Sequence, residues 1–484
     1  MLFNSLEYLL FLPIVYLLYW SLQEHLRIQN VLLLLASYFF YGLWDYRFLS
    51  LIILSSVTDY IIGIQLEKSD VARTRKSLLA VSLIVNLGLL AVFKYFNFFI
   101  DSFTDLVGLF GLNANVPLLK IVLPVGISFY TFQTLSYTID VYRKKLKPTK
   151  SLLNFCTYVA FFPQLVAGPI ERASSLLPQI EAKRQFSFES SKDGLRQILW
   201  GLFKKVVIAD SCAVIVDSIF SSYHELWGPV LVLGAVLFAF QIYCDFSGYS
   251  DIAIGTSRLM GINLMQNFAT PYFARDVAEF WRRWHISLST WFRDYLYIPL
   301  GGSRVGKALQ FRNVFAIFLV SGFWHGANWT YMFWGLIHAL CYVPQLISKT
   351  NRNYIEVVAQ GKLFPRIGEL GRILTTFSIV TLAWIFFRSA SIGDSFSYIR
   401  RMITQSNISF GEVLSSLRVD PSELFIIAFF VSVMLFFEWL SRDGKHGLAA
   451  IGQNVYLRFT VYLFLCLCVL DYFNGETAFI YFQF

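Results

Sequence analysis

Charged residues are scarce in this sequence of 484 residues. Asp, Glu, Lys and Arg make up 15% of it, whereas hydrophobic residues make up 56% and aromatic residues 18%. Because a soluble domain has about 25% charged residues, the deficit excludes an ordinary soluble protein and indicates a polytopic membrane protein. The formal net charge of +9 is then explained by basic cytoplasmic loops, and we expect no nucleic-acid partner.

Patterns for metal binding and for removable leaders are also absent. The sequence has no HExxH, and its six cysteines are not spaced as zinc ligands, so we expect no bound metal. The cysteines read as small buried hydrophobes, although Cys244 beside Asp245 leaves a catalytic thiol as an alternative. The start, MLFNSLEYLLFLPIVYLLYW, lacks a basic region and a cleavage site, which predicts a retained first span. With no repeat and no linker, we expect one membrane domain over residues 1–484.

Apolar runs make up most of the chain. A spanning helix needs about 20 apolar residues, and several of the runs are shorter than that. We therefore predict an all-α bundle of about ten to twelve membrane helices with additional re-entrant or interfacial helices. The candidate segments lie near residues 6–20, 30–44, 48–64, 78–99, 117–133, 151–168, 198–220, 228–244, 311–323, 327–347, 372–388, 424–440 and 457–473.

Three segments are more polar or irregular than a plain span. Small and hydroxylated residues over 126–138 favour close helix packing, with a polar pore wall as the alternative. Pro163, Gly168 and Pro169 break any straight helix, which suggests backbone that lines a cavity. In the segment 228–262, two carboxylates (Asp245 and Asp251) could perform acid–base chemistry. We favour instead a hydrogen-bonding network at a helix end, with a break at Gly248.

The block from Arg275 to Arg312 carries the densest mixture of charge and aromatic side chains. Its aromatic residues recur at helical spacing, which predicts an interfacial helix with aromatics inward and arginines outward. His285 falls on the buried edge of that helix and is either a structural or a functional residue. The following IPLGGSRVGK lacks the spacing of a P-loop and is expected to be a turn, where Arg304 and Lys307 could meet a cofactor's phosphates.

The segment NVFAIFLVSGFWHGANW places His325 directly after a short apolar run, Val314 to Trp324. Gly322 and Gly326 flank it and permit close backbone approach and a bend. A histidine titrates near neutral pH and suits general base catalysis. We therefore favour a catalytic role for His325, with a structural role as the alternative, whereas His338 is expected to be a hydrogen-bonded core histidine.

Several long strings resemble the membrane-bound O-acyltransferase (MBOAT) superfamily, in its bacterial branch that acetylates alginate or peptidoglycan or D-alanylates teichoic acid. The strings, within residues 120–340, are LPVGISFYTFQTLSYTIDVYR, FFPQLVAGP, DFSGYSDIAIG, EFWRRWHISLSTWFRDYLYIPLGG and GFWHGANWTYMFWGLIH. The resemblance implies a central tunnel that narrows at the histidine of the WHG motif, His325, as the catalytic residue. It also implies that His285 is the second functional position.

The same resemblance implies an acyltransferase that uses a cytoplasmic thioester, which we expect to be acetyl-CoA, and an exported polysaccharide as acceptor. The ending FIYFQF resembles the acyl-carrying tyrosine motif of small D-alanylation partners. Tyr481 is thus a candidate acyl carrier, or else part of an interfacial aromatic belt. We expect a bacterial cytoplasmic membrane location and a separate SGNH-type transferase as partner. D-alanyl transfer, a transporter of acyl groups or polymer, and a non-catalytic scaffold are the alternatives.

Overall fold

The fold is built from helices. The computed structural model describes residues 1–484 except 113–117, 119–121, 167, 407–419, 452–453 and 474–484, and this described part contains no β-strand. Five helical segments in it are long and apolar enough to cross a membrane: Leu26–Lys68, Ala72–Gly108, Gly228–Leu259, Ile367–Arg388 and Pro421–Leu440. The prediction of an all-α polytopic membrane protein is therefore confirmed. The count of ten to twelve membrane helices and the central tunnel stay predictions.

The chain divides into two compact units, and the prediction of one domain stays a prediction. The first unit comprises Met1–Gly194 with Thr256–Met265, and the second comprises Leu195–Gly255 with Gln266–Phe484. The helices of the first unit are α1 (Leu6–Ser21), α2 (Leu26–Asp45), η1 (Tyr46–Phe48), α3 (Leu49–Lys68), α4 (Ala72–Leu90), η2 (Ala91–Tyr95), α5 (Phe96–Gly108), α6 (Ile127–Tyr142), α7 (Leu152–Ala160), α8 (Phe162–Leu165) and α9 (Ala173–Glu181).

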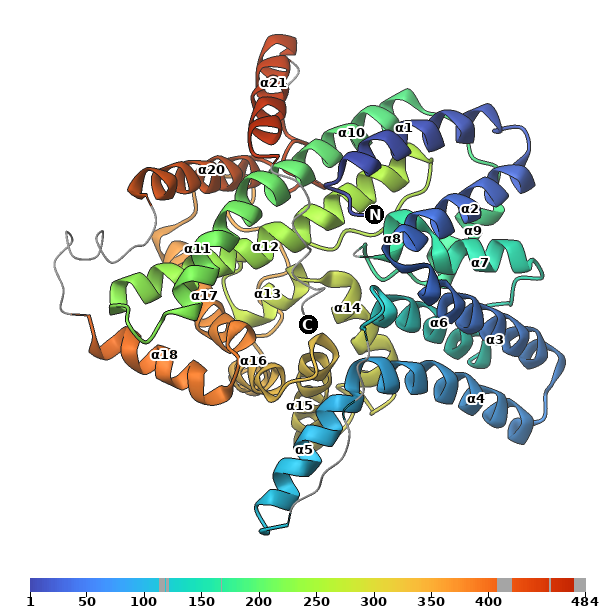
Figure 1. Ribbon diagram of the computed structural model, residues 1–484, viewed down its shortest axis with the longest axis horizontal. Helices are drawn as coiled ribbons and strands as arrows, with labels where there is room; N and C mark the ends of the chain where they lie inside the picture. Colours follow the sequence, from blue (N-terminus) through green and yellow to red (C-terminus); the bar gives the residue numbers. More distant parts are fainter. Residues whose placement is uncertain (113–117, 119–121, 167, 407–419, 452–453, 474–484) are drawn as a thin grey trace. The chain divides into compact units, whose positions relative to one another are not determined.

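In the first unit, α6 packs closely against α3 and α4, which lie beside it (Figure 1). The Asn86 amide oxygen accepts hydrogen bonds from Ser55 Oγ at 2.6 Å and from Thr134 Oγ1 at 3.2 Å, which joins the three helices. A Cβ on Gly63 would lie 2.6 Å from the hydroxyl oxygen of Tyr137, so only glycine fits there. These contacts support the interpretation of close helix packing over that of a pore wall.

The helix break predicted from Pro163, Gly168 and Pro169 is present. Helix α7 ends at Ala160 and α8 begins at Phe162. The amide N–H that the break frees on Phe162 donates to Ser37 Oγ at 3.0 Å. A side-chain partner of this kind is what irregular backbone requires in an apolar setting.

The second unit contains the residues expected to carry chemistry. Its helices are η3 (Phe203–Ala209), α11 (Asp210–Ser221), η4 (Pro271–Phe273), α13 (Val277–Arg283), α14 (Ile286–Phe292), η5 (Arg293–Tyr297), α15 (Lys307–His325), α16 (Trp329–Ile347), α17 (Ile367–Arg388), α18 (Ile392–Thr404), α20 (Pro421–Leu440) and α21 (Val455–Asp471). Two further helices, α10 (Phe188–Leu202) and α12 (Gly228–Leu259), have residues in both units.

The predicted break at Gly248 is wrong, because α12 runs through it without interruption. Glycine serves here for a close approach instead. A Cβ on Gly248 would lie 2.8 Å from the carbonyl oxygen of Gly201, and one on Gly201 would lie 2.6 Å from that of Gly248. The two backbones therefore touch where α10 continues into η3, and the absence of side chains on both permits it.

Candidate active site

His325 is the last residue of α15 and lies at a sharp corner of the backbone. The next residue, Gly326, is extended, and α16 starts three residues further on with Asn328 as its N-cap, whose side chain accepts from the Thr330 N–H at 2.9 Å. The His325 side chain is only 2% exposed. The apolar run and the two helix ends thus place an imidazole inside the second unit at a helix terminus.

Two glycines make this corner possible. A Cβ on Gly322 would collide with the carbonyl oxygen of Tyr331, and a Cβ on Gly326 would collide with the ring of the same tyrosine. On the next turn, a Cβ on Gly335 would collide with the backbone of Phe318. Helices α15 and α16 therefore touch along their backbones, and the close approach predicted for Gly322 and Gly326 is confirmed.

Aromatic rings form the walls around His325. Its ring centroid lies 5.0 Å from that of Trp324, 5.2 Å from that of Trp334 on α16 and 5.5 Å from that of Phe387 on α17. The fourth neighbouring ring is His285, at 6.4 Å between centroids. The structure thus brings together two histidines that are 40 positions apart in the sequence, and their roles in a site stay a prediction.

His285 lies at a break between two short helices. Its φ of 45° is in the left-handed region, and it separates α13 from α14. The side chain is fully buried, with Nδ1 at 3.1 Å from Asn267 Oδ1 and the ring 4.6 Å from that of Phe246. Burial lowers the pKa of His285 to about 3, so the ring is neutral at physiological pH. We call Gly322, His325, Gly326 and His285 the imidazole corner.

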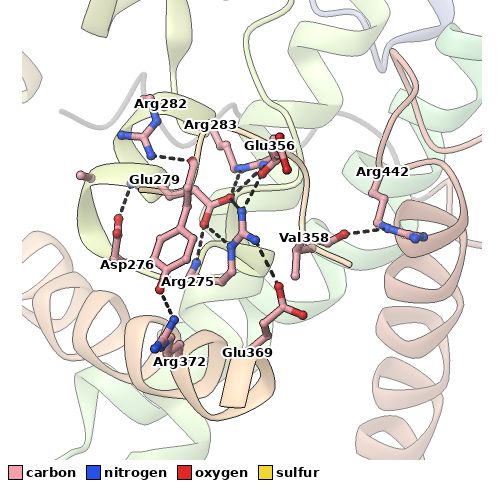
Figure 2. A network of polar contacts seen from close by, with 12 residues as sticks. Arg275, Asp276, Glu279, Arg282, Arg283, Glu356, Val358, Glu369, Arg372 and Arg442 are labelled. Atoms are coloured by element: carbon pink, nitrogen blue, oxygen red, sulfur yellow. Dashed lines mark hydrogen bonds and ion pairs between the residues drawn. The ribbon is translucent and has the colours of Figure 1, made fainter. Parts of the chain in front are cut away.

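The prediction of one interfacial helix with outward arginines is wrong in its single helix and holds for only some of its arginines, since Arg282 and Arg293 are exposed. The backbone breaks at His285, and Arg275 and Arg283 are buried because each binds the carboxylate of Glu279, which is 1% exposed (Figure 2). Nε of Arg275 lies 3.0 Å from Glu279 Oε2, and Nη2 of Arg283 lies 2.9 Å from Oε1. Arg275 Nη1 also binds Glu369 of α17 at 3.2 Å. We call Arg275, Glu279, Arg283 and Glu369 the arginine–glutamate network. In the sequence, the i, i+4 spacing of Arg275, Glu279 and Arg283 indicated that these opposite charges could pair on one helix.

A second set of buried charges lies on η3 and α12. Lys204 Nζ is 2.6 Å from Asp251 Oδ2, and Lys205 Nζ is 2.7 Å from Asp245 Oδ1. Both carboxylates are thus ion-pair partners, which supports their structural interpretation over acid–base chemistry. The sequence reasoning missed the two lysines, although adjacent lysines within the apolar run 198–220 were a signal.

A small polar cavity borders this second set of charges. Its volume is about 30 Å³, and since one buried water needs about 10–15 Å³ by this measure, it has room for one or two waters. The buried residues along it include Lys204, Tyr243, Asp251, Asn267 and Glu438. The cavity therefore reaches the amide that binds His285.

The other predicted site residues lie elsewhere. His338 is fully buried in α16 and its Nδ1 accepts from Trp281 Nε1 at 3.2 Å, as expected for a core histidine. Arg304 and Lys307 are exposed at the start of α15, at its opposite end from His325. Tyr481 lies outside the described residues. In the described part of the chain, no group of three or more His, Cys, Asp or Glu could hold a metal.

The geometry suits proton transfer in a buried site. A neutral imidazole can accept a proton from a hydroxyl group and return it to a leaving group. Aromatic walls lower the local dielectric constant, which strengthens every electrostatic interaction with a reacting group. The corner therefore has the parts for acyl transfer between a thioester and an alcohol.

Comparisons with known proteins agree with this chemistry. The family model described as MBOAT, membrane-bound O-acyltransferase family, matches residues 39–363. A protein named probable alginate O-acetylase from Pseudomonas syringae pv. tomato is 41% identical over 394 residues, which cover 81% of this chain and 73% of the relative. The peptidoglycan O-acetyltransferase of Helicobacter pylori is 34% identical over 439 residues, covering 84% and 81%.

A third relative is more distant. The teichoic acid D-alanyltransferase of Bacillus subtilis is 28% identical over 246 residues, which cover 48% of this chain and 61% of the relative. The similarity to the proteins named for O-acetylation thus extends over most of the chain, whereas that to the D-alanyltransferase covers about half of it.

Proposed function

The chain belongs to the membrane-bound O-acyltransferase family, and we propose that this enzyme transfers an acetyl group from a cytoplasmic thioester, acetyl-CoA, toward the O-acetylation of an exported polysaccharide. Support for the acetyl group comes from the relatives named alginate O-acetylase and peptidoglycan O-acetyltransferase, whose similarity covers more than four fifths of the chain. An alginate-like polymer or peptidoglycan is the proposed acceptor class. The location is the bacterial cytoplasmic membrane.

The observation that carries the proposal is the imidazole corner. Two buried histidine rings lie 6.4 Å apart between centroids, and the corner that holds His325 tolerates no side chain at Gly322 or Gly326. We assign His325 as the general base and His285 as the residue that orients the thioester.

The reaction proceeds by attack of a hydroxyl oxygen on the thioester carbonyl carbon. His325 takes the hydroxyl proton as the new C–O bond forms. The C–S bond then breaks, and the imidazolium gives the same proton to the leaving sulfur, so that the products are an acetyl ester and the free thiol of CoA. Base catalysis of this kind contributes typically about 10²–10⁴-fold, and the buried setting protects the thioester from hydrolysis.

The hydroxyl that attacks first need not belong to the polysaccharide. Tyr481 is a proposed acyl carrier that would pass the acetyl group on as a phenyl ester. A separate SGNH-type transferase outside the membrane would then complete delivery to the polymer. This division of labour agrees with the sequence resemblance, on which it depends.

Two other functions are distinguishable in one assay. D-alanyl transfer would need a D-alanyl thioester, and its support is the match to D-alanyltransferases over about half of this chain. A transporter of acyl groups or polymer would move its cargo without forming a bond. Purified protein incubated with radiolabelled acetyl-CoA separates these cases, because only acetyl transfer leaves labelled ester, and its loss in Tyr481→Phe identifies the carrier.

The decisive variant is His325→Ala, with His338→Gln as the matched control. We expect His325→Ala to lose at least about 10²-fold in acetyl transfer while it inserts at wild-type levels. His338→Gln, which also changes a buried histidine of the second unit, keeps kcat within about threefold because it keeps a polar partner for Trp281. Wild-type acetylation by His325→Ala at equal protein level refutes the assignment.

A further inference from the structure

Asn267 is a fully buried polar residue that contacts His285 directly. It precedes η4 in the second unit, and neither its sequence context nor its spacing marks it as a site residue. Its Oδ1 lies 3.1 Å from Nδ1 of His285 and accepts from Ser287 Oγ at 2.8 Å and from the Ser287 backbone N–H at 3.3 Å. At its other end, Nδ2 donates to Ser250 Oγ at 3.0 Å.

The backbone N–H of Ser287 fixes the orientation of the Asn267 amide. A backbone N–H can only donate, so the amide atom that faces it must be the oxygen. A flipped amide would set its NH2 group against that N–H. The serine hydroxyl of Ser250 can accept from Nδ2, so both ends of the amide are satisfied in this one orientation.

We infer that Asn267 is a positioning residue, which holds His285 as the tautomer with its proton on Nδ1. Because the amide oxygen only accepts, the contact of 3.1 Å requires Nδ1 to donate. The Ser287 hydroxyl oxygen also lies 3.4 Å from Nδ1, but its shorter contact is the one of 2.8 Å to Asn267 Oδ1, to which it donates its proton. A neutral imidazole has one N–H, so the lone pair is then on Nε2. Second-sphere partners of this type commonly fix which nitrogen of a functional histidine carries the proton.

This inference rests on the proposed function and sharpens the role of His285 in it. An imidazole with its lone pair on Nε2 can accept a hydrogen bond there but cannot donate one. His285 therefore cannot stabilise the oxyanion of the tetrahedral intermediate through Nε2 as a neutral donor. It instead accepts a hydrogen bond from a group in the reaction space, such as the attacking hydroxyl, while His325 carries the proton.

The tautomer can be measured without any activity. In protein labelled with ¹⁵N-histidine, we expect one signal pair, absent in His285→Gln, with a pyrrole-type Nδ1 and a pyridine-type Nε2. Asn267→Leu should lose this pattern and lower kcat for acetyl transfer by about 10- to 100-fold, with KM for acetyl-CoA unchanged. Asn267→Asp keeps an acceptor for Nδ1–H and should keep both the tautomer and kcat within about fivefold.

Ser250→Ala is the control, because it removes the partner of Nδ2 and leaves the oxygen end of the amide intact. A wild-type His285 with its proton on Nε2 overturns the inference, as does Asn267→Leu with undiminished kcat. If Asn267→Leu does not fold, Asn267→Asp decides, since loss of the Nδ1–H tautomer there also overturns it. Absence of acetyl transfer by the wild-type protein would instead contradict the proposed function and leave the tautomer measurement valid.

Discussion

The imidazole corner and the arginine–glutamate network are both buried sets of ionisable side chains in the second unit, and they differ in how their polarity is balanced. In the network, Glu279 faces two guanidinium groups at 3.0 and 2.9 Å, and one of them reaches Glu369 as well. In the corner, the rings beside His325 are those of Trp324, Trp334, Phe387 and His285. In the network each charge pairs with an opposite charge, whereas in the corner the imidazole of His325 packs against aromatic rings.

This difference distinguishes buried ionisable groups that stabilise the fold from those that can take part in a reaction. The Glu279 carboxylate is paired with two arginines, so it stabilises the fold and does not exchange protons in a reaction. The network also rigidifies the segment that contains α13. An imidazole between aromatic rings can gain and lose a proton during a reaction. Removing one member of the network should therefore affect folding, whereas removing His325 should affect turnover.

The largest effect on stability is expected for Glu279→Gln. The change removes the anion between Arg275 and Arg283, which leaves Arg275 with Glu369 alone and takes from the buried Arg283 the carboxylate that it binds; breaking a buried ion pair in this way costs about 3–5 kcal/mol. Thermal unfolding in detergent should show a much lower midpoint, and the yield of folded protein should fall. The exposed Glu67 of α3 offers a control, since Glu67→Gln should stay within about 0.5 kcal/mol of wild type.

The contrast would break down if Glu279→Gln kept the wild-type unfolding midpoint. It would also break down if His325→Ala lowered that midpoint as much as Glu279→Gln does. Either result would mean that burial, rather than the pairing of charges, determines how much each set contributes to the fold.

An intermediate effect is expected from pH, through the buried His285 of the corner. The pKa of His285 is lowered by burial to about 3, against about 6.5 in the unfolded chain. Below pH 6.5 the unfolded state therefore binds a proton at His285 that the folded state does not bind. The free energy of unfolding is thus undiminished by this residue above pH 6.5 and decreases as the pH falls from 6.5 toward 3. Between pH 7 and pH 5 the loss amounts to about 2 kcal/mol.

His285→Gln should remove that part of the pH dependence. The measurement is the unfolding midpoint between pH 5 and pH 7 for wild type, His285→Gln and His25→Gln, in which the exposed His25 is the control. Parallel curves for wild type and His285→Gln would show that His285 is not desolvated in the folded protein, and the comparison between corner and network would lose its basis.

Much of the fold could be predicted from composition and apolar run lengths, because both follow from the chemistry of the lipid environment. Local backbone geometry could not. The interruption at His285 and the uninterrupted α12 at Gly248 both depend on tertiary contacts. Asn267 supports the first, and the backbone of Gly201 permits the second.

The site divides in the same way. The environment of His325 followed from its position in the sequence, since an apolar run ends there between two glycines. The partners of His285 and Glu279 could not be predicted, because Asn267 and Glu369 come from other segments. Whether a buried charge is structural or reactive depends on its partners from other segments. A single sequence does not show which distant segments meet in the fold.

The smallest effects are expected at Arg304 and Lys307, which lie outside both sets. Helix α15 is about 27 Å long, so these exposed residues are remote from His325 at its other end. If they meet the phosphates of acetyl-CoA, the double change to alanine removes exposed ion pairs of about 0.2–1 kcal/mol each. KM for acetyl-CoA should then rise severalfold at low salt, with kcat unchanged, and the effect should fade as added salt screens the charges.

The exposed Lys362 provides the control variant, Lys362→Ala. An unchanged KM at low salt would exclude both residues from donor binding, and a lowered kcat would show that the corner is coupled to the far end of α15.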